Sequence, residues 1–214
     1  MGAIYLVRHG QASFGSHDYD ALSERGLRQA AVVGDELRRR GPRVTHVLSG
    51  TMRRQRDTAD AAGFDARQDP RWNEYAHQDV LAAHTALDGS ELADPRTFQA
   101  ALDSALEQWV RAGSAVDGAE GWPEFACRVH AAFDEVLGSL GKGENAVVFT
   151  SGGVIGALVA RVLGQRAETF IGLHRVTCNG GITKLVTGRS GTNLVSFNEH
   201  GHLENDSADL LTYR

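Results

Sequence analysis

Residues 3–11 read AIYLVRHGQ, a short apolar run with β-branched side chains that ends directly in charged and polar residues. A run of this length is typical of a buried strand. A second run, AVVF at residues 146–149, is the most apolar of the expected strands, and TSGG at 150–153 follows it. The two runs predict two buried strands, each followed at once by residues that could bind a ligand.

Strand and helix patterns alternate outward from these two runs. The other expected strands are 44–48, 178–186 and 194–198, with a short strand or extended loop over 64–75. The expected helices are 23–40, 52–62, 95–110, 123–140 and 152–163. Such alternation predicts an α/β fold with a largely parallel sheet and helices on both faces. The last two strands, joined by a turn at 188–191, predict an antiparallel edge strand.

The chain has 214 residues. At roughly 150 residues per domain, this length predicts a single domain spanning 1–214. The pattern changes between about residues 77 and 140, which we interpret as a helical insertion that lies over the sheet.

Charge and composition exclude several classes of protein. Lys and Arg number 22 against 27 Asp and Glu, for a net charge of -5, which argues against a protein that binds nucleic acid by neutralising phosphates. No apolar run approaches the roughly 20 residues that span a bilayer. The N-terminus lacks the basic region of a signal peptide, and two cysteines imply no disulfide framework. We expect a cytoplasmic protein with no nucleic-acid or membrane partner, and nothing in the sequence indicates an oligomeric state.

Polar residues gather where the expected strands end. They are Arg8 and His9 after the first strand, Arg53, Arg54 and Arg56 after the second, Glu74 after the third, and residues 150–153 after the fourth. Ligands of open α/β sheets bind beyond the carboxyl ends of the strands. Arginine forks and helix N-termini both suit tetrahedral oxyanions. The pattern therefore predicts an anion site at this edge of the sheet.

Four segments carry a resemblance to a known family. LVRHGQ at residues 6–11 resembles the signature of the histidine phosphatase superfamily, also called phosphoglycerate mutase-like. LSERGLRQA at 22–30 is similar to that family's L-T/S-x-x-G-x-x-Q-A, and SGTMRRQRDTA at 49–59 to its S-x-x-x-x-R-A-x-Q-T-A, which places the motif arginine at Arg54. NEY at 73–75 resembles the segment that bears the family's acidic residue.

The resemblance implies a metal-independent phosphatase that acts on a small phosphomonoester and needs no cofactor. The nucleophile would be His9, forming a phosphohistidine, and Glu74 would protonate the leaving oxygen and then activate water. The implied catalytic residues are His9, Glu74, Arg8 and Arg54. The implied phosphate-binding or substrate-binding residues are Gln11, Ser13, Ser151 and Gly152, with the Gly152 and Gly153 amides holding phosphate oxygens. No metal site is expected, because arginine supplies the charge, and substrate specificity is expected to lie in the variable insertion over the active site.

The chain departs from the family at one important position. The family has S-H-G-G after the last parallel strand, whereas this chain has TSGG, so Ser151 replaces the second core histidine. A neutral hydroxyl in place of a cation is expected to cost about tenfold in rate. His77, His174 and His202 are the candidates to compensate. Two alternatives stay open: a catalytically weak phosphate-binding or regulatory protein of the same fold, and a phosphoglycerate mutase.

Overall fold

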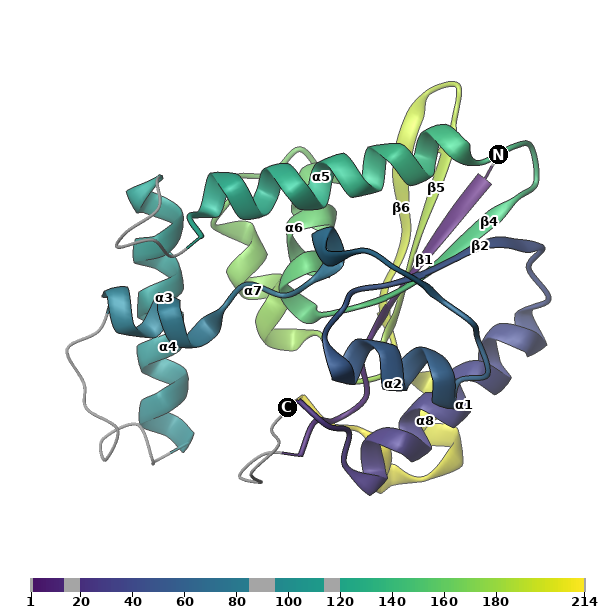
Figure 1. Cartoon of the computed structure of the whole chain (residues 1–214), viewed down its shortest axis with the longest axis horizontal. Helices are drawn as coiled ribbons and strands as arrows, with labels where there is room; N and C mark the ends of the chain where they lie inside the picture. Colours follow the sequence, from purple (N-terminus) through teal and green to yellow (C-terminus); the bar gives the residue numbers. More distant parts are fainter. Residues whose placement is uncertain (1, 14–19, 85–94, 114–119, 214) are drawn as a thin grey trace.

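The sheet lies at the centre of the molecule. The computed structural model describes residues 2–13, 20–84, 95–113 and 120–213. Within these residues, six strands form one sheet in the order β3-β2-β4-β1-β5-β6 (Figure 1). The strands are β1 (Gly2–Arg8), β2 (Val44–Ser49), β3 (Arg67–Gln68), β4 (Asn145–Thr150), β5 (Ile182–Gly188) and β6 (Gly191–Glu199). The pairs β1–β4, β2–β4 and β2–β3 are parallel, whereas β5 runs antiparallel to β1 and β6. The predicted fold class is confirmed.

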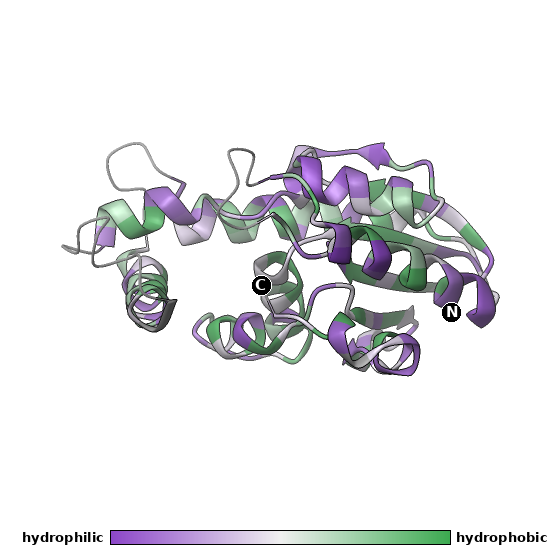
Figure 2. Cartoon of the chain, turned by 90° about the horizontal axis from the view of Figure 1, so that it is seen from below, coloured by the Kyte–Doolittle hydropathy of each residue, from purple (hydrophilic) through white to green (hydrophobic). Residues whose placement is uncertain are grey.

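Helices cover both faces of the sheet because its central strands are apolar on both sides. Ile4 and Leu6 of β1 belong to one hydrophobic core, and Tyr5 and Val7, which alternate with them, belong to another. Against the first core pack α5 (Trp122–Ser139), α6 (Gly152–Val162) and α7 (Thr169–Val176). Against the second pack α1 (Glu24–Arg40) and α2 (Arg53–Ala61). Figure 2 shows hydrophobic residues concentrated on the sheet between the two helical layers.

The predicted insertion, about residues 77–140, lies over the sheet only in its last part, α5; its first part is a pair of helices that extends beyond the end of the sheet, and we keep the name insertion for this pair. It consists of α3 (His77–His84) and α4 (Pro95–Ala112), which contact each other and lie at the left of Figure 1. Leu106 and Trp109 of α4 are buried in the same core as Phe125 of α5. The insertion therefore shares its core with the helices on the sheet. None of the helices in the described ranges is both long and apolar enough to cross a membrane.

The structure differs from the predicted elements near the C-terminus. β5 begins at Ile182 instead of residue 178, because Gly180 has a φ of 71° and starts a turn. The turn contacts the end of β1: the Gly180 N–H donates to the Arg8 carbonyl at 3.0 Å, and the Arg8 N–H donates to the Gly181 carbonyl at 3.1 Å. The helices α3, α7 and α8 (Gly201–Asp206) were not predicted, since helices of eight and six residues carry little periodic signal.

Candidate active site

His9 is held by its own backbone at the point where β1 ends. The His9 N–H donates to the carbonyl of Thr150 at 2.9 Å, which continues the β1–β4 pairing, and the Asn179 amide donates to the His9 carbonyl at 3.2 Å. The next residue, Gly10, lies so close to α1 that a Cβ there would come within 2.4 Å of the Gly26 carbonyl oxygen. The sequence His-Gly thus allows the strand end and the start of α1 to meet around a buried imidazole.

The two ring nitrogens of His9 have different partners. Nδ1 lies 2.7 Å from the Gly10 carbonyl oxygen, which only accepts, so Nδ1 carries the proton. Nε2 lies 3.1 Å from Nε of Arg54, which only donates, so Nε2 presents its lone pair. Burial lowers the pKa of His9 well below its usual value, and the charges of Arg54 and Arg8 lower it further. His9 is therefore a neutral imidazole with a fixed tautomer, which is the form a nucleophile requires.

Arg54 is the arginine of α2 that contacts His9. Thr58 ties the helix to the His9 loop, because its hydroxyl donates to the Arg54 carbonyl at 2.6 Å and accepts from the Gly10 N–H at 3.0 Å. The side chain of Arg54 is 7% exposed, whereas that of Arg53 is 50% exposed and pairs with Asp57. The geometry thus places Arg54 at the nucleophile and Arg53 at the surface.

A carboxylate also binds Arg54. Asp20 Oδ1 accepts from Arg54 Nη1 at 2.5 Å, and Asp20 Oδ2 accepts from the backbone N–H of Arg53 at 2.7 Å. The carboxylate therefore bridges the guanidinium and the first turn of α2, both of which suit an anion. Sequence reasoning missed Asp20, because a single acidic residue in a polar loop carries no distinguishing pattern.

Arg8 reaches the site from the last residue of β1. Its Nη1 donates to the carbonyls of Thr177 and Tyr213, the latter at 3.0 Å. The C-terminal segment thus orients this guanidinium. Its charge lowers the pKa values of both His9 and His174, so Arg8 lies within electrostatic range of both imidazoles.

Glu74 is positioned by α5 and by the start of α6. Arg128 of α5 donates to the carbonyls of Arg71, Asn73 and Glu74 at 3.0, 2.7 and 3.4 Å and so holds the backbone after the 3-10 helix η1 (Pro70–Trp72). The Glu74 carboxylate accepts from the Gly153 N–H at 2.8 Å. Burial raises the pKa of Glu74, against the opposing effect of that hydrogen bond. A buried carboxyl with a raised pKa suits proton donation.

Gly153, the second residue of α6, leaves room for the Glu74 carboxylate in this arrangement. A Cβ on Gly153 would lie 2.2 Å from Oε1 of Glu74. The Gly153 amide, which the family resemblance assigns to phosphate, donates to Glu74 in this structure. Because Gly153 has no side chain, the Glu74 carboxylate can reach the N-terminus of α6.

Ser151, which the resemblance assigns to phosphate binding, is fully buried and hydrogen-bonded to another side chain. Its Oγ accepts from Nε2 of Gln55 at 2.8 Å, and the same amide group donates to the Trp72 carbonyl at 3.2 Å. Ser151 precedes Gly152 at the start of α6 without capping that helix through its side chain. Gln55 was not singled out from the sequence, although it stands where the family motif has alanine.

Gln11 and Ser13 lie on the segment that follows His9. Gln11 Oε1 accepts from the hydroxyl of Ser23 at 3.1 Å, and the Ser13 N–H donates to the Ala21 carbonyl at 2.8 Å. Both contacts run toward the start of α1. A substrate contact for these two residues stays a prediction.

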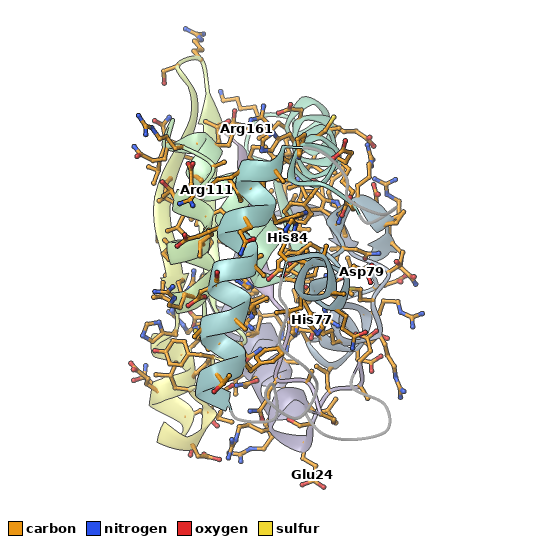
Figure 3. The ribbon with its side chains drawn as sticks, turned by 90° about the vertical axis from the view of Figure 1, so that its left-hand side faces the viewer. Glu24, His77, Asp79, His84, Arg111 and Arg161 are labelled. Atoms are coloured by element: carbon orange, nitrogen blue, oxygen red, sulfur yellow. The ribbon has the colours of Figure 1, made fainter. Side chains whose placement is uncertain are left out.

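The three candidate histidines occupy different places. His174 of α7 has its Nε2 3.8 Å from Oε2 of Glu74. His202 of α8 has its Nε2 3.0 Å from the Gly180 carbonyl oxygen. His77 begins α3 on the insertion, seen end-on in Figure 3, and its pKa is lowered by burial and by the charge of Arg54. His174 is thus the candidate that directly faces the predicted acid.

Comparisons with known proteins identify the family of the chain. A family model described as the histidine phosphatase superfamily (branch 1) matches residues 4–200. A search among curated proteins found no match to the chain. A mycobacterial glucosyl-3-phosphoglycerate phosphatase complexed with VO3 is similar, with 23% identity, a TM-score of 0.68, and 92% of this chain and 99% of that chain covered.

Two further solved structures share the fold. A phosphoserine phosphatase mutant from Entamoeba histolytica, in complex with phosphoserine, is 16% identical, with a TM-score of 0.67 and with 95% of this chain and 100% of that chain covered. The Bacillus stearothermophilus protein YhfR is 16% identical, with a TM-score of 0.70 and the same coverage, 95% and 100%.

Proposed function

The chain belongs to the histidine phosphatase superfamily (branch 1), and from that premise we propose that it hydrolyses a small phosphomonoester through a phosphohistidine at His9. The observation that carries the proposal is the pair of contacts on the His9 ring: Nδ1–H donates to a carbonyl, and Nε2 faces Arg54 with its lone pair. A nucleophile needs its free lone pair directed at the site that binds the phosphate.

The first step transfers the phosphoryl group to His9. The lone pair of His9 Nε2 forms a bond to phosphorus, the bond from phosphorus to the ester oxygen breaks, and that oxygen takes the proton from Glu74. A phosphate oxygen would replace Nε2 as the acceptor of the Arg54 Nε–H. The charges of Arg8 and Arg54 offset the negative charge that spreads over the transferring oxygens.

The second step returns the enzyme to its starting state. The Glu74 carboxylate takes a proton from water, the water oxygen bonds to phosphorus, and the phosphorus–Nε2 bond breaks. Inorganic phosphate leaves, and His9 recovers its lone pair on Nε2. The raised pKa of Glu74 suits both of its roles, because it is protonated before the first step and regains a proton in the second.

We propose that the reaction needs no metal ion. Arg8 and Arg54 supply two positive charges next to His9. Within the described ranges, no three His, Cys, Asp or Glu side chains are grouped as a metal site would require. The donor set fits an anion held by guanidinium groups better than a divalent cation.

Small phosphorylated metabolites are the proposed substrates. The similar solved structures include phosphatases described as acting on glucosyl-3-phosphoglycerate and phosphoserine. In this chain the segment after Glu74 leads directly into α3, which supports the proposal that the insertion contacts the part of the substrate beyond the phosphate. This is why we assign substrate selection to the insertion and the reaction to the sheet edge.

The proposal is tested by trapping the phosphoenzyme. The protein is mixed with a labelled phosphomonoester and quenched, and the label is expected at His9 as an acid-labile, base-stable adduct. His9→Ala should abolish both the label and the turnover of p-nitrophenyl phosphate. Label that persists in His9→Ala would refute His9 as the nucleophile.

A weak phosphate-binding protein is the second candidate, since the Ser151 hydroxyl is engaged by Gln55 and a carboxylate occupies Arg54. Binding of inorganic phosphate without any turnover would support that candidate over the phosphatase. Isomerisation of 3-phosphoglycerate would instead support a mutase.

A further inference from the structure

Two departures from the family motifs meet in the interior. Gln55 stands where the motif S-x-x-x-x-R-A-x-Q-T-A has alanine, and Ser151 stands where S-H-G-G has histidine. The Gln55 amide donates to the Ser151 hydroxyl at 2.8 Å, and both side chains are fully buried. Residue 55 is thus longer than the motif alanine, residue 151 is shorter than the motif histidine, and the two side chains are hydrogen-bonded to each other. This hydrogen bond joins Ser151 to α2.

His174 of α7 lies next to the start of α6, the helix that Ser151 precedes. A Cβ on Gly152 would lie 2.9 Å from Cδ2 of His174 and 3.4 Å from its Nε2. Nε2 is also 3.8 Å from Oε2 of Glu74. We propose that His174, entering from α7, contacts the substrate phosphate in the role that the second core histidine of the β4–α6 turn has in the family. This inference rests on the proposed function and names one more catalytic residue for it.

The ring of His174 is held firmly but remains accessible. It stacks on Phe170 with ring centroids 5.9 Å apart and meets Tyr75 edge-on at 5.8 Å. Its side chain is 19% exposed, whereas that of Glu74 is 9% exposed. A ring fixed by two aromatic contacts and still partly exposed is preorganised to donate to a ligand.

The positive charge of Arg8 near His174 suits an anion. Arg8 and Glu74 face the ring, and His9 is close enough for His174 to affect its pKa. Burial and the charge of Arg8 lower the pKa of His174 to about 3, so the ring is neutral before a substrate arrives. A neutral imidazole still has one N–H to donate to a phosphate oxygen, and a bound dianion favours its protonated form.

The other two histidines fit the role less well. Nε2 of His202 is bonded to the Gly180 carbonyl, and the charges acting on its ring are Glu36, Arg40 and Glu199, away from Glu74. The charges that act on the pKa of His77 are those of Arg54 and Asp79, and this residue belongs to the insertion. His174 combines contact with the start of α6, proximity to Glu74 and the influence of Arg8.

The test compares substitutions that preserve the packing of the ring. His174→Phe keeps the stacking on Phe170 but removes the N–H, and Arg175→Ala on the same helix is the matched control. We expect His174→Phe to lower kcat for p-nitrophenyl phosphate about 100-fold, as the loss of an oxyanion donor does, and to weaken vanadate and inorganic phosphate binding without lowering the melting temperature. Arg175→Ala should leave both unchanged.

The alternative is that Ser151, and not His174, contacts the substrate phosphate. If Ser151→Ala costs more activity and phosphate affinity than His174→Phe, or if His174→Phe changes neither, the assignment is overturned. The exchange of positions is tested by Gln55→Ala/Ser151→His/His174→Ala, which restores both motif residues. It should be about tenfold more active than His174→Ala, and equal activity at an unchanged melting temperature would refute the exchange.

The two proposals fail in different ways. If the unmodified protein forms no phosphoenzyme and shows no turnover, the proposed function fails. His174 is then judged by the affinity for inorganic phosphate, which needs no turnover: a weakened affinity in His174→Phe supports the contact, and an unchanged one overturns it.

Discussion

Replacing Asp20 with asparagine is expected to tighten the binding of inorganic phosphate about fivefold, because its carboxylate competes with phosphate for Arg54. Oδ1 of Asp20 accepts from Nη1 of Arg54 at 2.5 Å, and Oδ2 accepts from the Arg53 N–H at 2.7 Å. An incoming phosphate that uses Nη1 must displace Oδ1. Asparagine keeps an oxygen that can accept from Arg53 but removes the charge.

The magnitude follows from the burial of the two partners. When the asparagine oxygen accepts from Arg53, its NH2 group faces Arg54, so the hydrogen bond between the two charged groups, which contributes about 1.5–3 kcal/mol in a dry site, is lost. The Arg54 side chain is 7% exposed, but that of Asp20 is 36% exposed. Solvent screening reduces the gain to about 1 kcal/mol, which corresponds to about fivefold in Kd.

Titration calorimetry with inorganic phosphate measures this change. Asp57→Asn is the matched control, because Asp57 pairs with Arg53 of α2 at 3.3 Å and its substitution also removes one negative charge near that helix without touching Arg54. The gain in Asp20→Asn should exceed that in Asp57→Asn and should shrink at high salt. Equal gains in both variants would mean that the overall charge of the protein, and not displacement from Arg54, governs phosphate affinity.

Three more outcomes follow from the site. Glu74→Gln should lower kcat about 10²–10⁴-fold, with a larger loss for an alkyl phosphate than for p-nitrophenyl phosphate, since the better leaving group needs less protonation; equal losses in a steady-state assay would argue against the acid role. Because the pKa of His9 is lowered and that of Glu74 is raised, kcat/KM of the unmodified protein should persist well below pH 6.5 and fall as pH rises through the raised pKa of Glu74; a pH profile of Glu74→Gln that keeps this alkaline fall would contradict the assignment. Arg54→Ala should lose several kcal/mol of transition-state stabilisation in kcat/KM and Arg53→Ala little, and similar losses would contradict the placement of Arg54 at His9.

Much of the fold follows from local sequence. The apolar run that ends in Arg8-His9 forms β1, and alternation of its residues between the two cores follows from the two-residue period of a strand. Strand ends in a parallel sheet lie at one edge, so His9 and Glu74 could be predicted to lie at the same edge although they are far apart in the chain. The short helix α7 could not, since eight residues give too little periodicity to distinguish it from a loop.

The sequence by itself determined which residues stand at the sheet edge, because hydrophobic runs and the residues that end them are properties of neighbours in the chain. Only the tertiary structure decided what those residues contact. The order β4-β1-β5 brings the end of β1 between Thr150 and the turn at Gly180. The pairing of Gln55 with Ser151 and the approach of His174 to Glu74 join residues 96 and 100 positions apart. Such contacts depend on how separate helices pack over the sheet, and no local pattern specifies that packing.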